Sequence, residues 1–312
     1  MRISDISVVI PTKERPDDLR RCVESLIAQK DVMPKEVLIV DCGEPEKRLD
    51  LFGFKSVPFP VRRIDAPVGL TKQRNIGIRS AAGTIVAFLD DDCAVTENYI
   101  AAMESAYGAL PDAGGISGII LTWPKTGFAQ KLFWKFFFLT ENAGSGKLRI
   151  SGAPSFLDQE VCKRLGKPVK VEVLPGVCSY RRTVFEHGLL FDEGLGGYAW
   201  GEDYEFSYRV SRLFNLYVVP DVETYHFHTK TTRINFEGFY YQWATNGYIF
   251  WKRFKSKAGL KARAAFGVLI IGLFIKAIKD CFSSRSISAV RGCIKGTLQI
   301  ISLSKKEKAP LR

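Results

Sequence analysis

The stretch Ile85-Val86-Ala87-Phe88-Leu89-Asp90-Asp91-Asp92 carries the strongest structural signal in this sequence. Five apolar residues precede three carboxylates, and a short continuous apolar run predicts a strand buried on both faces, here Ile85–Leu89. Such strands are typical of parallel sheets covered by helices. The carboxylates therefore follow the end of a buried strand, which is the edge at which α/β proteins bind ligands.

Strands and helices alternate on the N-terminal side of this stretch. The other predicted strands are short runs rich in β-branched residues, and they are Ile6–Ile10, Val37–Val40 and Val61–Ile64. Pro11 is expected to stop the first of them. Apolar residues at helical spacing predict helices over Pro16–Gln29 and Thr71–Ala82. This alternation predicts right-handed βαβ units on a parallel sheet.

The second half of the chain is less regular. Further strands are predicted at Gly115–Leu121, Val171–Leu174, Val177–Tyr180 and Leu216–Val219. A helix is predicted over Asp203–Leu213, after a glycine-rich loop at Gly194–Gly201, whereas Glu141–Gly152 has the composition of a loop. From about residue 235 the pattern becomes helical, over Phe236–Phe254 and Ala258–Phe282.

Composition and charge exclude several classes of protein. The chain has 312 residues, 46% of them hydrophobic, and a mean hydropathy of −0.01, which excludes a disordered chain. The net charge is +12, yet residues 252–312 hold 15 Lys and Arg against two acids, so the first 251 residues are close to neutral. A neutral body argues against a nucleic-acid partner.

Cysteine usage and the N-terminus bear on the compartment. The seven cysteines are odd in number and form no Cys-x-x-Cys pair, which favours free thiols in a reducing compartment. The first residues run directly into a predicted strand without an apolar signal-peptide core. The chain is therefore expected to start in the cytoplasm.

Asp90–Asp92 form the first candidate site. Three adjacent carboxylates repel one another, and Mg²⁺ or Mn²⁺, which prefers oxygen ligands, relieves that repulsion. A solvated acidic turn is the alternative, and the position after a buried strand favours a metal site. Lys72 and Arg74, on the preceding predicted helix, are either diphosphate contacts or part of a basic helix face.

Two further polar groups come later in the chain. Glu202 and Asp203 open a predicted helix, either as capping groups or with one of them as general base for an incoming hydroxyl. His226 and His228 follow the last predicted strand, as metal ligands or as structural histidines. The chain lacks Gly-x-Gly-x-x-Gly after its first strand, a P-loop and Gly-x-Ser-x-Gly, which disfavours dinucleotide-binding oxidoreductases and nucleophile-elbow hydrolases.

Taken in order, these segments resemble the inverting family 2 glycosyltransferases with a GT-A fold. The resemblance covers about residues 5–230. The motifs that carry it are Val8-Val9-Ile10-Pro11-Thr12 with Arg15, Val40-Asp41, Gly69 with Arg74-Asn75-Ile76-Gly77, Ala82-Gly83, Phe88–Asp92, Leu174-Pro175-Gly176 with Tyr180-Arg181-Arg182, Phe191-Asp192-Glu193, Gly201–Glu205 with Arg209, and His226. It implies an α/β, Rossmann-like fold with a mostly parallel sheet and flanking helices.

The resemblance implies a nucleotide-diphosphate-sugar donor. The residues that it implies in donor binding are Pro11, Thr12, Arg15, Asp41, Lys72, Arg74, Asp90 and Asp91. Among them, Thr12 and Asp41 are implied at the base, Arg74 at the base or the diphosphate, and Asp90 near the ribose. Many relatives have Ser two residues after the aspartate that ends the second strand, and here Asp41-Cys42-Gly43-Glu44 lacks it.

The resemblance also implies the catalytic and metal-binding residues. Asp203 is implied as the general base, with Glu202 orienting the acceptor beside it. Asp92 and His226 are implied as ligands of Mn²⁺ or Mg²⁺, with His228 as the weaker candidate. A metal at this position stabilises charge on the departing nucleoside diphosphate, and a single displacement with inversion needs no enzyme nucleophile.

The basic C-terminal region predicts an association with membranes. Its bases accompany apolar clusters at Phe266–Ile275 and Ile300–Leu303, a combination typical of interfacial helices on anionic leaflets. The uncharged run Ala264–Ile275 has 12 residues, short of the roughly 20 that span a bilayer. We expect a peripheral protein on the cytoplasmic face of the inner or plasma membrane, near a glycan or lipid-linked acceptor. A helix packed on the body with a solvated basic face is the alternative.

These patterns predict two domains and favour one function. Residues 1–235 are expected to form the GT-A domain, divided into a nucleotide-sugar half (1–121) and an acceptor half (122–235), and residues 236–312 a helical basic region. The favoured function is metal-dependent glycosyl transfer in the synthesis of bacterial surface polysaccharide or glycolipid. The alternatives are a catalytically silent, membrane-bound scaffold or binding subunit of a glycan-assembly complex and, more weakly, a nucleotidyltransferase.

Overall fold

The computed structural model of the chain groups its residues into two compact units. It describes residues 1–54, 56–123, 125–195, 198–229 and 235–306, with the backbone alone at 141–143 and 306. The first unit comprises residues 1–125, 157–198 and 202–233, and the second comprises residues 126–156, 199–201 and 234–312. The predicted domain boundaries, 1–121, 122–235 and 236–312, stay a prediction.

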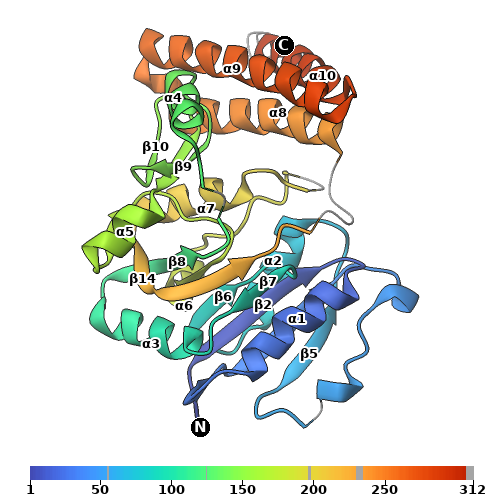
Figure 1. Ribbon diagram of the computed structural model, residues 1–312, viewed down its shortest axis with the longest axis vertical. Coiled ribbons are helices and arrows are strands. Elements are labelled where there is room, and N and C mark those ends of the chain that lie inside the picture. The colour runs from blue at the N-terminus through green and yellow to red at the C-terminus, as the bar shows by residue number, and fades with distance from the viewer. Residues whose placement is uncertain (55, 124, 196–197, 230–234, 307–312) are drawn as a thin grey trace. The chain divides into compact units, whose positions relative to one another are not determined.

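A mixed sheet forms the centre of the first unit (Figure 1). Its strand order is β12-β14-β8-β13-β6-β2-β4-β5, and β7 pairs with β14. The strands are β2 (Ile6–Thr12), β4 (Glu36–Asp41), β5 (Val61–Asp65), β6 (Ile85–Phe88), β7 (Cys93–Val95), β8 (Ala113–Ile120), β12 (Val169–Val171), β13 (Cys178–Arg181) and β14 (Asn215–His226). β1 (Arg2–Ile3) and β3 (Val32–Met33) form a separate parallel pair.

The N-terminal half of the sheet is parallel, as the βαβ pattern predicts. Strands β6, β2, β4 and β5 pair in parallel, whereas β13 is antiparallel to both of its neighbours, β6 and β8. The parallel strands place their carboxyl ends along one edge of the sheet. Asp90, Thr12 and Asp41 follow one another along that edge, because β6, β2 and β4 are neighbours in that order.

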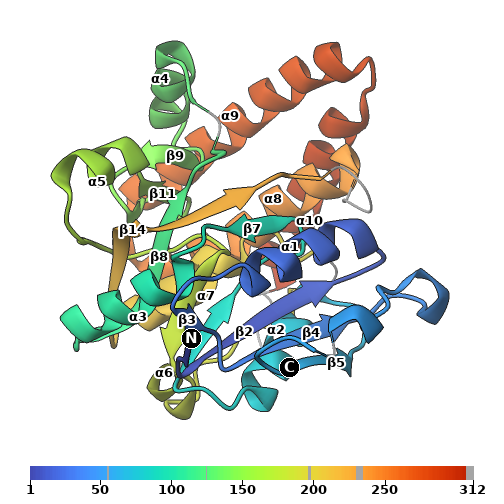
Figure 2. The same ribbon diagram turned by 60° about the horizontal axis from the view of Figure 1, so that its bottom comes forward.

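Helices cover both faces of this sheet. They are α1 (Pro16–Ile27), α2 (Leu70–Ser80), α3 (Tyr99–Ala109), α5 (Gln159–Leu165), α6 (Arg182–Glu186) and α7 (Glu202–Ser211). Successive residues of a strand point to opposite faces. Val8 of β2 accordingly packs in one core cluster with α1 and α3, and Val9 in another with α2 and α7. In Figure 2, α1 and α2 lie on opposite sides of β2.

The second unit consists mainly of helices. It contains α4 (Phe128–Phe136), α8 (Phe236–Phe254), α9 (Leu260–Ser284) and α10 (Ser288–Lys306), together with a small sheet of β9 (Glu141–Gly144), β11 (Pro154–Leu157) and β10 (Lys147–Leu148). Tyr240, Trp243 and Leu269 lie in its apolar core, against which Phe133 and Phe137 pack. No helix among the described residues has both the length and the apolar character needed to cross a bilayer.

Most predicted elements are present with small changes of boundary, and three predictions are wrong. Pro11 does not stop the first strand, because β2 continues to Thr12. The β2–β6 ladder ends at Val9. The backbone N of Pro11 points toward β6, as that of Val9 does, so its missing N–H removes no hydrogen bond from a ladder. The region Glu141–Gly152 is not all loop, because it contains β9 and β10.

The third wrong prediction is the strand Val171–Leu174, which ends at Val171 in the structure. The N–H of Leu174 donates to the Ser207 side chain on α7, and Ser207 supplies a partner that a neighbouring strand would otherwise provide. The last predicted strand is also longer than expected, since β14 runs on to include His226. Gly196 and Gly197 of the glycine-rich loop, and residues 307–312 of the basic region, lie outside the described residues.

Candidate active site

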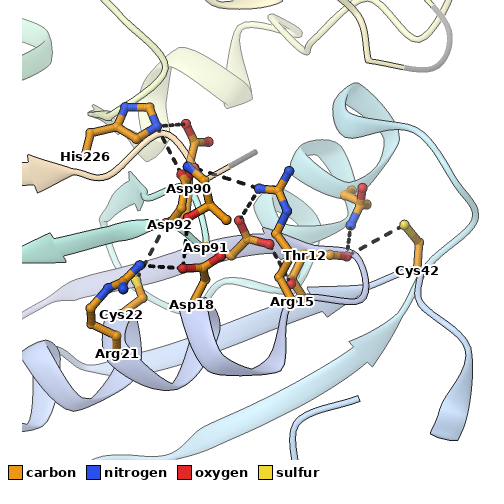
Figure 3. Close-up of polar contacts among 12 residues, drawn as sticks. Thr12, Arg15, Asp18, Arg21, Cys22, Cys42, Asp90, Asp91, Asp92 and His226 are labelled. Carbon is orange, nitrogen blue, oxygen red and sulfur yellow. Dashed lines mark hydrogen bonds and ion pairs between the residues drawn. The ribbon is translucent and has the colours of Figure 1, made fainter. Parts of the chain in front are cut away.

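The three adjacent aspartates point to different partners. Asp91 is held in the protein: its two carboxylate oxygens accept hydrogen bonds from the Thr12 hydroxyl at 2.8 Å and from the Arg15 guanidinium at 2.9 Å (Figure 3). Burial raises the pKa of the Asp91 carboxyl to about 6, although Arg15 and Thr12 oppose that rise. Thr12, Arg15 and Asp91 thus form one polar group in which Thr12 and Asp91 are buried, and Asp90 and Asp92 lie on either side of Asp91 in the sequence.

Asp90, Asp92 and His226 form a candidate metal site. The His226 Nε2 atom lies 3.0 Å from an Asp92 carboxylate oxygen and 3.8 Å from one of Asp90. Potential ligand atoms of these three residues and of Cys93 all lie within 4.8 Å of one another. Strand pairing explains the approach, because His226 on β14 is directly opposite Cys93 on β7. In Figure 3, His226 reaches from β14 toward Asp90 and Asp92.

The chemistry of these donors fits a hard divalent cation. Two carboxylates and one imidazole suit Mn²⁺ or Mg²⁺. Cys93 is the least suitable donor of this group, because its soft sulfur prefers zinc, copper or iron–sulfur centres to a hard cation. The residues that fit the cation are therefore Asp90, Asp92 and His226.

The segment that follows β14 is hydrogen-bonded to Asp92. The N–H of Phe227 donates to the Asp92 carbonyl at 3.0 Å, and the N–H of Thr229 donates to the Asp92 carboxylate at 2.9 Å. The Thr229 hydroxyl donates to Asp18 on α1 at 3.0 Å. The His228 ring lies 3.9 Å from the His226 ring, centroid to centroid. Sequence analysis did not identify Thr229 or Asp18, because no motif marks either of them.

Arg74 connects the two groups of acidic residues. Its guanidinium lies 3.3 Å from an Asp90 oxygen and 3.1 Å from a Glu202 oxygen. The side chain is buried, with the residue 1% exposed, and the rings of Phe88 and Phe191 lie within 6 Å of its guanidinium. The structure thus places Arg74 between the candidate metal site and the start of α7.

Glu202 and Asp203 lie at the N-terminus of α7, as the sequence predicts. Burial raises the pKa of both carboxyls, and Arg74 opposes this rise in both. Asp203 accepts a hydrogen bond from the N–H of Tyr204 at 2.8 Å and is partly exposed, whereas Glu202 is only 8% exposed. Of the two, Asp203 is the more accessible to a second substrate.

The remaining predicted donor residues lie along the same edge. Asp41, at the end of β4, is 2% exposed and accepts a hydrogen bond from the N–H of Gly43 at 2.8 Å. The other Asp41 oxygen lies 3.4 Å from Arg63 and 3.9 Å from Arg48, two residues that sequence analysis missed. Arg63 was detectable, because it lies on β5, the neighbour of β4.

Pro11, Lys72 and Gln73 complete the description of this edge. Pro11 pairs with Val40 in the β2–β4 ladder, and Lys72 is partly exposed in the first turn of α2. Gln73 was not predicted, although its amide donates to the carbonyls of both Thr12 and Val40. Gln73 therefore ties α2 to the ends of β2 and β4.

A family model matches more than half of the chain. The model described as Glycosyl transferase family 2 matches residues 7–187. The chain belongs to this family. The matched range contains Thr12, Asp41, Arg74 and the aspartates Asp90–Asp92, and it ends before Glu202, Asp203 and His226. These last three residues enter the site through the structure, by their distances to residues inside the matched range.

Comparison with individual proteins supports the family and the fold. Glycosyltransferase AglE of Haloferax volcanii is 25% identical over 167 residues, which are 52% of this chain and 55% of that protein. The chain thus spans about half the length of this curated relative. The crystal structure of S. aureus TarS 1-349 superposes with a TM-score of 0.53 at 16% identity, covering 91% of this chain and 74% of that one.

A second solved structure shares the fold. The crystal structure of GalNAc-T7 with UDP, GalNAc and Mn²⁺ gives a TM-score of 0.53 at 19% identity, covering 77% of this chain and 47% of that one. The fold is therefore GT-A, a Rossmann-like mixed α/β sheet with flanking helices.

Proposed function

We propose that the chain transfers a sugar from a nucleotide-diphosphate-sugar to an acceptor hydroxyl with inversion at the anomeric carbon. The observation that carries the proposal is the link through Arg74: one guanidinium lies within 3.3 Å of Asp90 in the candidate metal site and within 3.1 Å of Glu202 beside the candidate base. A transferase needs both a donor-binding group and a base, and here they are joined.

Donor binding is assigned to the carboxyl edge of β2, β4 and β6. Thr12 and Asp41 are proposed at the base, and Asp90 near the ribose, while Arg15 and Asp91 hold this edge in place through their contact at 2.9 Å. Asp92 and His226, with Asp90 beside them, would hold Mn²⁺ or Mg²⁺. Such a cation supplies charge stabilisation to the diphosphate leaving group.

Proton transfer is assigned to Asp203. The acceptor oxygen forms a bond to the anomeric carbon, the bond from that carbon to the diphosphate oxygen breaks, and the nucleoside diphosphate leaves with the electron pair. The hydroxyl proton goes to the Asp203 carboxylate. Glu202 is held by Arg74 and is proposed to orient the acceptor. One displacement without an enzyme nucleophile inverts the anomeric configuration.

The acceptor is proposed to be a glycan or a lipid-linked sugar in the synthesis of bacterial surface polysaccharide or glycolipid, on the cytoplasmic face of the membrane. The family supports the chemical class, and the basic, apolar-rich C-terminal region supports the location. A silent scaffold subunit is the competing function. It is disfavoured by the approach of His226 to Asp92 at 3.0 Å, since a scaffold needs no such cluster of metal-binding groups.

The test is a thermal-shift screen of the full chain against UDP-, GDP- and dTDP-sugars, with and without Mn²⁺. A ligand at a hundred times its Kd stabilises the folded state by about 2.7 kcal/mol. We expect a metal-dependent shift with one nucleotide class, lost in Asp92→Ala, and transfer of its sugar. A shift that persists in Asp92→Ala, or a complete lack of donor turnover with an intact shift, contradicts the assignment.

A further inference from the structure

Helix α9 in the second unit exposes a narrow stripe of apolar residues, which we call the α9 stripe. Its members recur every three or four residues, and they are Leu260, Ala264, Gly267, Ile271, Ile275, Ile278 and Phe282. At about 100° per residue, these positions fall within about 80° of one another around the helix. Leu260 and Phe282, at its two ends, are 81% and 83% exposed.

The opposite face of α9 is what holds the helix in the unit. Its buried residues are Ala262, Ala265, Phe266, Leu269, Gly272, Leu273 and Ala277. Phe266 stacks on Trp251 of α8 with ring centroids 5.0 Å apart, and a Cβ at Gly272 would lie 2.3 Å from the Cβ of Phe137. Because α9 already has a packed face, the α9 stripe is a second apolar face that folding of the unit does not require.

The charges beside the α9 stripe are all positive. Lys261 and Lys279 are exposed on one side of it and Arg263 on the other, each about 40° from its margin. The one acid of α9, Asp280, is held by Lys276 at 2.7 Å and by the Tyr240 hydroxyl at 2.5 Å. An apolar stripe with a basic border is typical of a helix that lies in a lipid interface.

Helix α4 repeats this arrangement within the same unit. Phe128, Leu132 and Phe136 recur every four residues and are 83%, 57% and 68% exposed. Lys131 and Lys135 precede Leu132 and Phe136 by one residue each. Large exposed aromatic residues are costly in water, and two such faces in one unit indicate a surface that is covered in the working protein.

We propose that the α9 stripe lies in the interface of an anionic lipid membrane, with α9 parallel to the bilayer plane. The proposal deepens the proposed function by naming the surface that brings the transferase to a lipid-linked acceptor. A second copy of the chain is the other candidate occupant. Charge argues against it, because pairing two α9 stripes would bring Lys261, Arg263 and Lys279 against like charges, whereas anionic headgroups neutralise them.

The test is sedimentation of the full chain with vesicles of phosphatidylcholine containing about a third phosphatidylglycerol. The variant Ile271→Gln/Ile278→Gln/Phe282→Gln is expected to bind these vesicles about tenfold or more weakly than the parent chain. The matched control Phe52→Gln/Leu213→Gln removes side chains that are 70% and 63% exposed in the first unit, and it is expected to bind like the parent. Far-ultraviolet circular dichroism verifies that all variants are folded.

A second variant separates the basic border from the apolar stripe. Lys261→Glu/Arg263→Glu/Lys279→Glu is expected to lose the preference for anionic over pure phosphatidylcholine vesicles. If the parent chain does not bind anionic vesicles, or if both sets of variants bind like the parent, the proposal is overturned. A parent chain that dimerises through the α9 stripe instead of binding vesicles also overturns it.

The thermal-shift screen distinguishes this outcome from a failure of the proposed function. Donor binding in the first unit requires Asp92 and not the α9 stripe. Loss of vesicle binding with an intact donor shift in the triple glutamine variant supports the surface assignment alone. A parent chain that shifts with donor but ignores vesicles leaves the proposed transferase standing and removes the membrane surface.

Discussion

The candidate active site of the first unit and the α9 stripe of the second depart in opposite ways from what stabilises a domain. The site buries charge, since Arg74, Asp91 and Asp92 are at most 4% exposed. The α9 stripe exposes apolar area, since Phe282 is 83% exposed. Buried charge carries a desolvation cost, and exposed apolar area forgoes the stabilisation of burial. Both departures occur where we place a ligand, so stability and function compete at both.

The largest expected effect of a single substitution is on kcat, at Asp203 in the candidate active site. In Asp203→Asn, kcat is expected to fall by about 10²–10⁴, because an amide of the same shape takes no proton from the acceptor. Donor affinity and unfolding temperature are expected to stay close to those of the parent. Steady-state rates with the donor found by the thermal-shift screen measure this, and a loss of less than tenfold would remove Asp203 from the role of base.

Arg74 provides the largest expected effect on stability. At a pH at which Glu202 is ionised, Asp90 and Glu202 lose their buried counter-charge in Arg74→Met, and the free energy of unfolding is expected to fall by about 3–5 kcal/mol. Urea denaturation measures the change. The double variant Arg74→Met/Glu202→Gln is the control, since it removes one of the stranded charges and is expected to recover part of the loss. Equal stability of the single and double variants would show that Arg74 does not neutralise Glu202.

The acid limb of the pH profile gives the next effect. Burial raises the pKa of Asp203 and Glu202 above the ordinary carboxyl value of about 4. Protonation disables the base, so kcat/KM is expected to fall as the pH drops, with a midpoint above about 5. A midpoint at about 4 in the measured profile would contradict the raised pKa.

Stability is expected to respond to pH with the opposite sign. The folded chain keeps protons on these two carboxyls at pH values where the unfolded chain has released them, so the free energy of unfolding falls as the pH rises through this window. Each tenfold difference in proton affinity is worth about 1.4 kcal/mol. Urea denaturation of the parent and of Glu202→Gln at several pH values measures this, and the variant is expected to show a weaker dependence.

The α9 stripe is expected to show the smallest effect. Ile275→Gln is expected to change the free energy of unfolding by less than about 0.5 kcal/mol, because the side chain is already 41% exposed and the opposite face of α9 does the packing. Urea denaturation in the absence of lipid measures it. Leu269→Gln, on the buried face, is the matched control and is expected to destabilise the unit strongly. Comparable losses in both variants would mean that Ile275 belongs to the core.

The predictable parts of this molecule are those with local causes. The strand before Asp90 follows from a run of consecutive apolar residues, and α8 has the bounds that its pattern predicts. β9 was missed because its sequence has no apolar alternation and pairing with β11 creates the strand. The predicted strand Val171–Leu174 extends too far toward the C-terminus, because the N–H of Leu174 donates to Ser207, 33 residues later, and not to a neighbouring strand.

The same distinction holds within the site. The order of motifs predicted Asp92, Asp203 and His226 as site residues, because each follows a recognisable local pattern. The role of Arg74 as a link was not predictable, since its partner Glu202 lies 128 positions later in the chain. The margins of the α9 stripe were not predictable either, because the apolar run Ala264–Ile275 does not show which of its residues pack in the core.

The irregularity in β14 makes the geometry of the candidate metal site depend on the number of residues in one segment. β14 pairs with β8 up to Val218, resumes at Glu223 after a register shift, and then pairs with β7 so that His226 comes opposite Cys93. Neighbouring residues of a strand face opposite ways. A deletion of one residue between Val218 and Glu223 would therefore present the ring of Phe227 in place of the imidazole, in a chain whose core is otherwise complete. The number of residues in this bulge thus determines the candidate donor site as much as its side chains do.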